Sequence, residues 1–100
     1  MTRTPHGYRT HWLRLTNNSP SDVVFRIEPW ASEATMPVGA TFVVAIMGPA
    51  EGDILEVELR DRDITVYGWS GSTIAVHRDR KLVMGWDLPV PETPPRKAEL

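Results

Sequence analysis

The chain has 100 residues, of which 41% are hydrophobic and 24% charged, and this suffices for one domain with one core. Its net charge is −2, with 11 basic residues interleaved among 13 acidic ones, so the clustered basic side chains that nucleic-acid binding requires are missing. With no cysteine, neither a disulfide framework nor thiol chemistry is available.

The hydropathy pattern also argues against export and membrane insertion. The first eight residues lack the apolar run of a secretory signal, and no stretch approaches the roughly 18 consecutive apolar residues of a membrane helix. We therefore expect a cytoplasmic protein with neither a membrane nor nucleic acid as a partner.

Apolar and polar residues alternate with period two in the first part of the chain, which is typical of β-strands with one buried face. Strands are predicted over 11–16 and 23–28, separated by turn-forming asparagine, serine and proline residues. In the first strand the alternation turns Leu13 and Leu15 inward and Trp12 outward.

The middle of the chain is less regular. Residues 30–36 predict at most a two- or three-residue strand near Thr35, and residues 37–40 form a proline-glycine turn. Residues 41–47 are apolar in both phases, so we expect the most buried strand there.

The second half of the domain continues the strand pattern. Residues 54–60 alternate most strictly and predict a half-buried strand whose wet face carries Glu56 and Glu58. Residues 78–81 predict the tip of a hairpin. Further strands are expected over 64–69, 73–77 and 82–86. The fold class is therefore all-β, an antiparallel two-sheet sandwich of seven or eight strands.

Composition divides the chain into three parts. Residues 1–10 form an N-terminal arm, residues 11–88 the β-sandwich domain, and residues 89–100 a flexible tail with four prolines. The spacing P-x-x-P in residues 91–94 suits a proline-recognition ligand, but a disordered terminus is the preferred interpretation.

No residue pattern points to a metal or cofactor. His6, His11 and His77 do not supply the three or four ligands of a zinc site, and a blue-copper site needs a cysteine. His77 with Met47 or Met84 would suit a softer ion, but methionines in β-proteins are usually core residues.

Catalytic motifs are also missing. Residues 68–72 resemble the G-x-S-x-G nucleophile motif but end in serine, and no helix is predicted after them, so we interpret them as a turn. The carboxylates between residues 51 and 63 fit a charged face and a turn. We expect a protein that is not an enzyme and has no catalytic residue.

The aromatic residues leave two interpretations open. Trp12, Tyr67 and Trp69 share a phase opposite the predicted core residues. They either fill a small core or form an exposed patch that marks a contact surface. The three residues are our candidate interface.

Four short runs carry a resemblance to known sequences. They lie at 15–19, 27–30, 36–39 and 69–73 and include N-N-S, E-P-W and P-x-G turns. Over about residues 12–85 the chain resembles an uncharacterised family of short bacterial proteins. The resemblance implies a β-sandwich similar to cupredoxin-like or immunoglobulin-like domains, without copper ligands.

These observations favour a non-catalytic protein-binding module, with self-association as one form of binding. The alternative is a small-molecule or glycan-binding domain in which outward aromatic side chains stack on the ligand.

Overall fold

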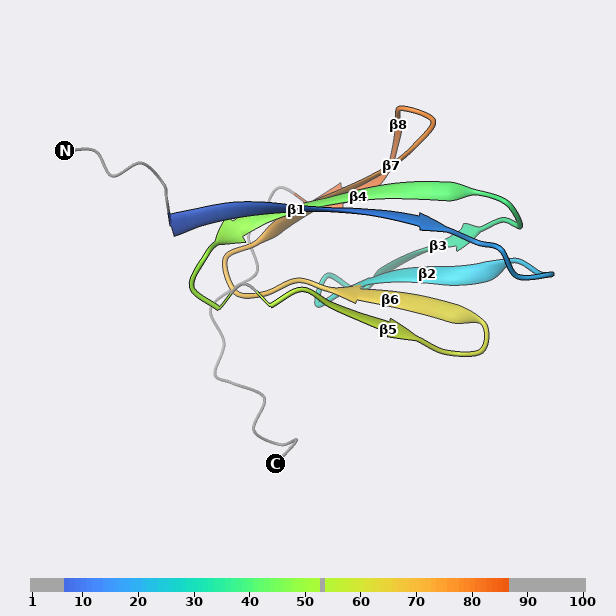
Figure 1. The fold of residues 1–100 in the computed structure, drawn as a ribbon, viewed down its shortest axis with the longest axis horizontal. Helices are drawn as coiled ribbons and strands as arrows, with labels where there is room; N and C mark the ends of the chain where they lie inside the picture. Colours follow the sequence, from blue (N-terminus) through green and yellow to red (C-terminus); the bar gives the residue numbers. More distant parts are fainter. Residues whose placement is uncertain (1–6, 53, 87–100) are drawn as a thin grey trace.

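The computed structural model describes residues 7–52 and 54–86, which fold as a two-layer β-sandwich (Figure 1). Sheet A has the strand order β1-β4-β7-β8, and sheet B has the order β3-β2-β6-β5. The strands in chain order are β1 (Tyr8–Thr16), β2 (Val23–Glu28), β3 (Ser32–Met36), β4 (Thr41–Pro49), β5 (Glu56–Leu59), β6 (Asp63–Tyr67), β7 (Thr73–Arg78) and β8 (Lys81–Trp86). The predicted all-β sandwich is confirmed.

Sheet A is antiparallel throughout, with β4 between β1 and β7. β1 and β4 pair over their whole lengths, from Tyr8 opposite Pro49 to Thr16 opposite Thr41. The β7–β8 hairpin turns at Asp79 and Arg80, whose φ angles of 51° and 68° match the tight turns favoured between twisted strands. The predicted hairpin tip is confirmed.

Sheet B departs from the prediction of a purely antiparallel sandwich. β2 pairs with β3 and β5 pairs with β6 antiparallel, but β2 and β6 run parallel. Between β2 and β6 the chain forms β3, enters sheet A as β4, and returns through the β5–β6 hairpin. The alternation of apolar and polar residues indicates which side of a strand is buried. It is the same whether the neighbouring strand runs parallel or antiparallel, so the sequence pattern did not predict the parallel pair.

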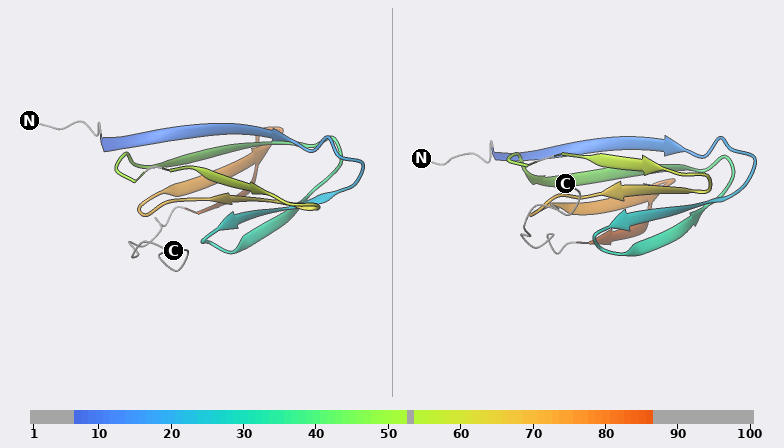
Figure 2. Two further views of the ribbon diagram at one scale, coloured as in Figure 1. Left: turned by 60° about the horizontal axis from the view of Figure 1, so that its bottom comes forward. Right: turned by 90° about the horizontal axis from the view of Figure 1, so that it is seen from below.

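The core lies between the sheets, which Figure 2 shows as two layers. Phe25 of β2 and Phe42 of β4 meet edge to face, with ring centroids 5.1 Å apart. This contact joins one sheet to the other. The fully buried apolar side chains around it are Ile27, Met36, Val44, Ile46, Val66 and Val76. The predicted inward phases of Val23, Phe25 and Ile27 are confirmed.

Asn17 anchors the turn between β1 and β2. Its Nδ2 donates hydrogen bonds to the carbonyl oxygens of Ser21 at 2.9 Å and Met36 at 3.0 Å. Its Oδ1 accepts from the backbone N–H and the hydroxyl of Ser19. A single buried amide thus ties the end of β1 to the end of β3.

Two segment boundaries differ from the prediction. β1 begins at Tyr8, so residues 8–10 of the predicted arm belong to sheet A. β3 has five residues, because Ser32–Met36 pairs along β2 despite its polar composition. The Pro-rich tail at 89–100 and the first six residues lie outside the described residues.

In the part of the chain that the structure describes, no helix has the length and hydropathy to cross a membrane.

Gly48 is required where β4 passes the turn before β7. A β-carbon at Gly48 would lie 2.7 Å from Ser72 Cα and 2.8 Å from Ser72 Cβ, closer than van der Waals contact permits. We expect Gly48→Ala to lower the free energy of unfolding by about 1–3 kcal/mol through overpacking. Urea denaturation measures this, with Gly7→Ala as the control because its β-carbon meets no atom within 4 Å. Equal stability of the two variants would contradict the packing described.

Candidate functional site

The three aromatic residues of the predicted interface do not share a surface. Trp12 lies on the outer face of sheet A and is 69% exposed. Tyr67 is half-buried on β6 of sheet B. Trp69 is 7% exposed and belongs to the core. The prediction that they form one exposed patch is therefore wrong, and for Trp69 the alternative of a core side chain is confirmed.

Trp69 turns inward because the strand ends before it. β6 stops at Tyr67, and Trp69 starts a turn in which the Ser72 hydroxyl accepts from the Trp69 N–H and donates to the Trp69 carbonyl oxygen. The indole Nε1 donates to the Pro49 carbonyl oxygen at 2.8 Å. The ring also meets His11 edge to face, with centroids 5.5 Å apart. Extending the two-residue alternation of the strand beyond Tyr67 therefore predicted the wrong side of the sheet for Trp69.

The same contacts shape the segment that resembles a nucleophile motif. Ser72 is fully buried, and its hydroxyl is engaged within the turn. Gly71 has a φ of 83°, which glycine adopts without strain. The interpretation of residues 68–72 as a turn is confirmed.

Tyr67 has a local partner on the neighbouring strand. Its hydroxyl donates to Glu58 Oε1 at 2.8 Å, and this hydrogen bond, with some desolvation, raises the pKa of Tyr67 above its ordinary value. Glu58 also accepts from Arg60 at 2.9 Å. Tyr67 thus joins β5 to β6 on a polar surface.

The outer face of sheet B is charged. Arg26 of β2 donates to Glu33 of β3 at 2.9 Å and to Asp63 of β6 at 2.8 Å, and these hydrogen bonds raise the pKa of the guanidinium. The register places further carboxylates on the same face. The acidic residues of this face are Glu28, Glu33, Glu56, Glu58 and Asp63. This face is suited to water.

The outer face of sheet A has a different chemistry. Its described outward positions are Tyr8, Thr10, Trp12, Arg14, Thr16, Thr41, Val43, Ala45, Met47, Thr73, Ala75, His77, Leu82 and Gly85. None of these described positions is an aspartate or glutamate, and the large apolar side chains among them include Met47, which is 49% exposed. This outer face of sheet A is the candidate contact surface.

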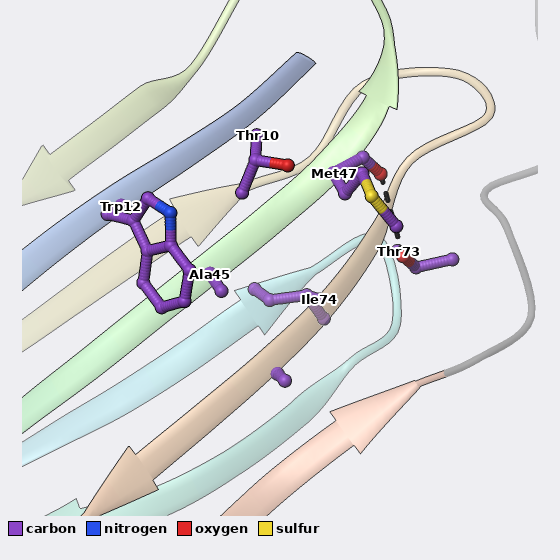
Figure 3. Close-up of a pocket in the computed structure, with 7 residues that line it drawn as sticks. Thr10, Trp12, Ala45, Met47, Thr73 and Ile74 are labelled. Atoms are coloured by element: carbon purple, nitrogen blue, oxygen red, sulfur yellow. Dashed lines mark hydrogen bonds between the residues drawn. The ribbon is translucent and has the colours of Figure 1, made fainter. Parts of the chain in front are cut away.

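A row of small residues runs from Trp12 across sheet A toward β8. Trp12 pairs with Ala45, Ala45 with Ala75, and Ala75 with Gly85, so one row crosses all four strands. Beside the indole is an open groove of about 320 Å³ (Figure 3). It is lined by Thr10, Trp12, Ala45, Met47, Thr73, Ile74 and Ala75. We call the residues Ala45, Ala75 and Gly85 the small-residue row.

The strand predicted to be the most buried supplies the middle of this surface. In β4 the inward residues Phe42, Val44 and Ile46 are buried, but Ala45 and Met47 face outward without a covering layer in the described residues. An apolar outward phase in a strand of a two-layer fold was the sequence signal for this surface.

A second exposed apolar set lies at the edge of sheet B. In β5, which was predicted to be half-buried, Leu59 is 70% exposed, and Val57 and the preceding Ile54 are also exposed. The charged Glu56 and Glu58 alternate with these residues, as is common where an edge strand must avoid further pairing.

Residues 7–52 and 54–86 contain no group of three or more histidine, cysteine, aspartate or glutamate side chains that would hold a metal ion. His6 lies outside these ranges.

Comparison with known proteins adds no relative. No protein-family model matches the chain, and searches of curated proteins and of solved structures found no significant match. The resemblance to a bacterial β-sandwich family stays a prediction.

The contrast between the two tryptophans predicts different effects of substitution. Trp69→Ala should lower the free energy of unfolding by about 3–5 kcal/mol, because it opens a cavity in the core. Trp12→Ala, on an open face, should change it by less than about 0.5 kcal/mol. Urea denaturation at low protein concentration tests both, and similar losses in the two variants would contradict the assigned positions.

Proposed function

We propose that this protein is a non-catalytic binding module whose outer face of sheet A contacts a protein partner. The observation that carries the proposal is the exposure of Trp12 beside the small-residue row. A large aromatic side chain in water next to apolar neighbours marks a contact surface. Tryptophan is also among the residues that most often dominate the energy of protein interfaces.

The groove favours an apolar protein side chain as its occupant. It is open, and its volume of about 320 Å³ is at the small end for a ligand pocket. Its polar side-chain groups are the hydroxyls of Thr10 and Thr73 and the indole N–H of Trp12, and the Thr73 hydroxyl lies 3.5 Å from the Met47 carbonyl oxygen. A methyl or aromatic group of a partner would replace water there without leaving a buried charge unpaired.

A glycan-binding function is the second candidate, supported by the same indole. An exposed tryptophan offers a flat apolar surface for a sugar ring, and Thr10 and Thr73 offer hydrogen bonds. The groove lining includes no amide or carboxylate side chain among the described residues, so few groups would orient a sugar.

We also propose a cytoplasmic location. The chain has no cysteine, so its core folds without the disulfides that persist only in oxidising compartments.

Photo-crosslinking from matched positions tests the proposed surface. Thr10 and Thr35 are exposed threonines on the outer faces of sheets A and B, respectively. With a photoreactive amino acid at either position in cells that make this protein, we expect a discrete protein adduct from position 10 and none from position 35. Protein contacts confined to the outer face of sheet A would produce this difference.

Two results would contradict this function. Equal labelling from both positions, or no adduct from position 10, would remove the support for a protein interface on sheet A. An oligosaccharide that raises the Tm of the protein but not of Trp12→Ala would favour the glycan-binding alternative, because a ligand stabilises the native state it binds.

A further inference from the structure

We infer that the partner is a second copy of this chain, packed face to face so that Trp12 of each copy sits over the small-residue row of the other. This inference rests on the proposed function, because it uses the same outer face of sheet A. It goes further by naming the occupant and the symmetry of the complex.

The face is complementary to itself. A closed pair needs a surface that carries both a projecting group and the site that receives it, since each copy must supply both. Trp12 projects from β1, at one end of the row, and Ala45, Ala75 and Gly85 continue the row across β4, β7 and β8. The projecting Trp12 and the small-residue row that would receive it therefore lie on the same surface of one chain.

The strand spacing fixes a suitable twofold axis. Neighbouring strands lie about 4.8 Å apart, so Ala75 is about 10 Å from the position of Trp12 along the row. A twofold axis parallel to β4, between the two copies, exchanges the positions of β1 and β7. This operation places Trp12 of one copy over Ala75 of the other.

The depth of the contact also suits these residue sizes. Packed sheets lie about 10 Å apart, a distance that two layers of medium-sized side chains normally fill. Along the row, alanine and glycine leave much of that space empty. The Trp12 indoles, one from each copy, would fill this space. They would lie on either side of the point where the Ala45 residues of the two copies face each other.

Charge favours this face over the opposite one. Among the described outward positions of sheet A, burial would take from water the guanidinium of Arg14 and the ring of His77, but no carboxylate. Burial of the outer face of sheet B would enclose five carboxylates, those of Glu28, Glu33, Glu56, Glu58 and Asp63, against the two guanidinium groups of Arg26 and Arg60, and this excess of negative charge would meet its counterpart from the second copy. Like charges brought together and desolvated cost free energy, so two copies meet most easily through sheet A.

The available area fits a weak dimer. The three strands that overlap about this axis, β1, β4 and β7, at about 4.8 Å and with up to nine residues at about 3.3 Å, give a face of roughly 14 by 30 Å, or about 430 Å² per copy. The pair would bury about 860 Å² in total, which is in the range of weak, transient interfaces. We expect a reversible dimer that dissociates on dilution.

Sedimentation of the full chain measures this equilibrium. Between about 1 µM and 1 mM we expect a monomer–dimer transition, and Trp12→Ala should raise the dissociation constant at least about 30-fold, as for a central interface residue. Ala75→Arg should abolish the dimer by occupying the receiving site. Thr35→Arg, on the outer face of sheet B, should leave the dissociation constant unchanged. Thermal melts of each variant establish that its monomer is folded.

Engineered cysteines test the axis, since the natural chain has none. Thr10 and Thr73 both pair with Met47, from opposite sides, so within one copy they lie about 10 Å apart, too far for a disulfide. The proposed axis places Thr10 of one copy opposite Thr73 of the other. Packed sheets lie about 10 Å apart, so these facing positions are also too far apart for a direct disulfide, and a short thiol-specific bifunctional cross-linker is used to join them. We expect a mixture of Thr10→Cys and Thr73→Cys proteins to cross-link faster than either protein alone.

A chain that stays monomeric up to about 1 mM, or a dimer unaffected by Trp12→Ala and Ala75→Arg, would overturn the inference. Cross-linking within either single-cysteine protein that is as fast as in the mixture would overturn the proposed axis. These failures differ from a failure of the proposed function. A monomeric chain that still crosslinks a different protein from position 10 keeps the binding surface and loses only the second copy.

Discussion

Each sheet of this protein has one face against the shared core and one outer face that no other element of the described residues covers. The edge-to-face contact of Phe25 with Phe42 lies at the junction of the two sheets, and the inward residues of β2, β4, β6 and β7 surround it. The structure describes 79 of the 100 residues, 46 in 7–52 and 33 in 54–86. These residues form two layers and no third. The chemistry of the two outer faces therefore determines what the domain can contact.

The outer faces of the two sheets differ in chemistry. Sheet B presents Arg26 between Glu33 and Asp63, and Tyr67 bonded to Glu58, so its outer side chains are hydrogen-bonded to one another and hydrated. Sheet A presents Trp12 and a row of alanine and glycine. Transfer of their apolar surface out of water lowers the free energy, and a contact with a partner would supply that transfer. This difference is the reason why we propose a binding function for sheet A.

Much of the fold was readable from the sequence because alternation and burial have the same period in a strand. The inward phases of Leu13, Phe25 and Ile27 were predicted on that basis. The parallel pairing of β2 with β6 was not, since it depends on the path of the chain through three other strands. Trp69 was misplaced because the strand ends at Tyr67 and the hydrogen bonds of Ser72 set the direction of the turn.

The candidate surface was predicted in part. Trp12 was placed on an outer face correctly, but its neighbours could be identified only from the register that brings Ala45 and Ala75 beside it. In sequence these alanines are unremarkable members of apolar strands. Pairing across three strands turns them into one row, and a sequence pattern within one strand carries no information about that arrangement.

We propose that the outer face of sheet A is the contact surface of this domain. Nuclear magnetic resonance spectra of the Trp12 indole N–H and of the alanine methyl groups, recorded as the protein is concentrated, measure contact at this surface. If the contact forms there, the signals of Trp12, Ala45 and Ala75 move together, while that of Ala34, on the inner face of β3, stays fixed. Changes confined to β5, or signals of sheet A that do not respond to concentration or to any protein partner, would contradict it.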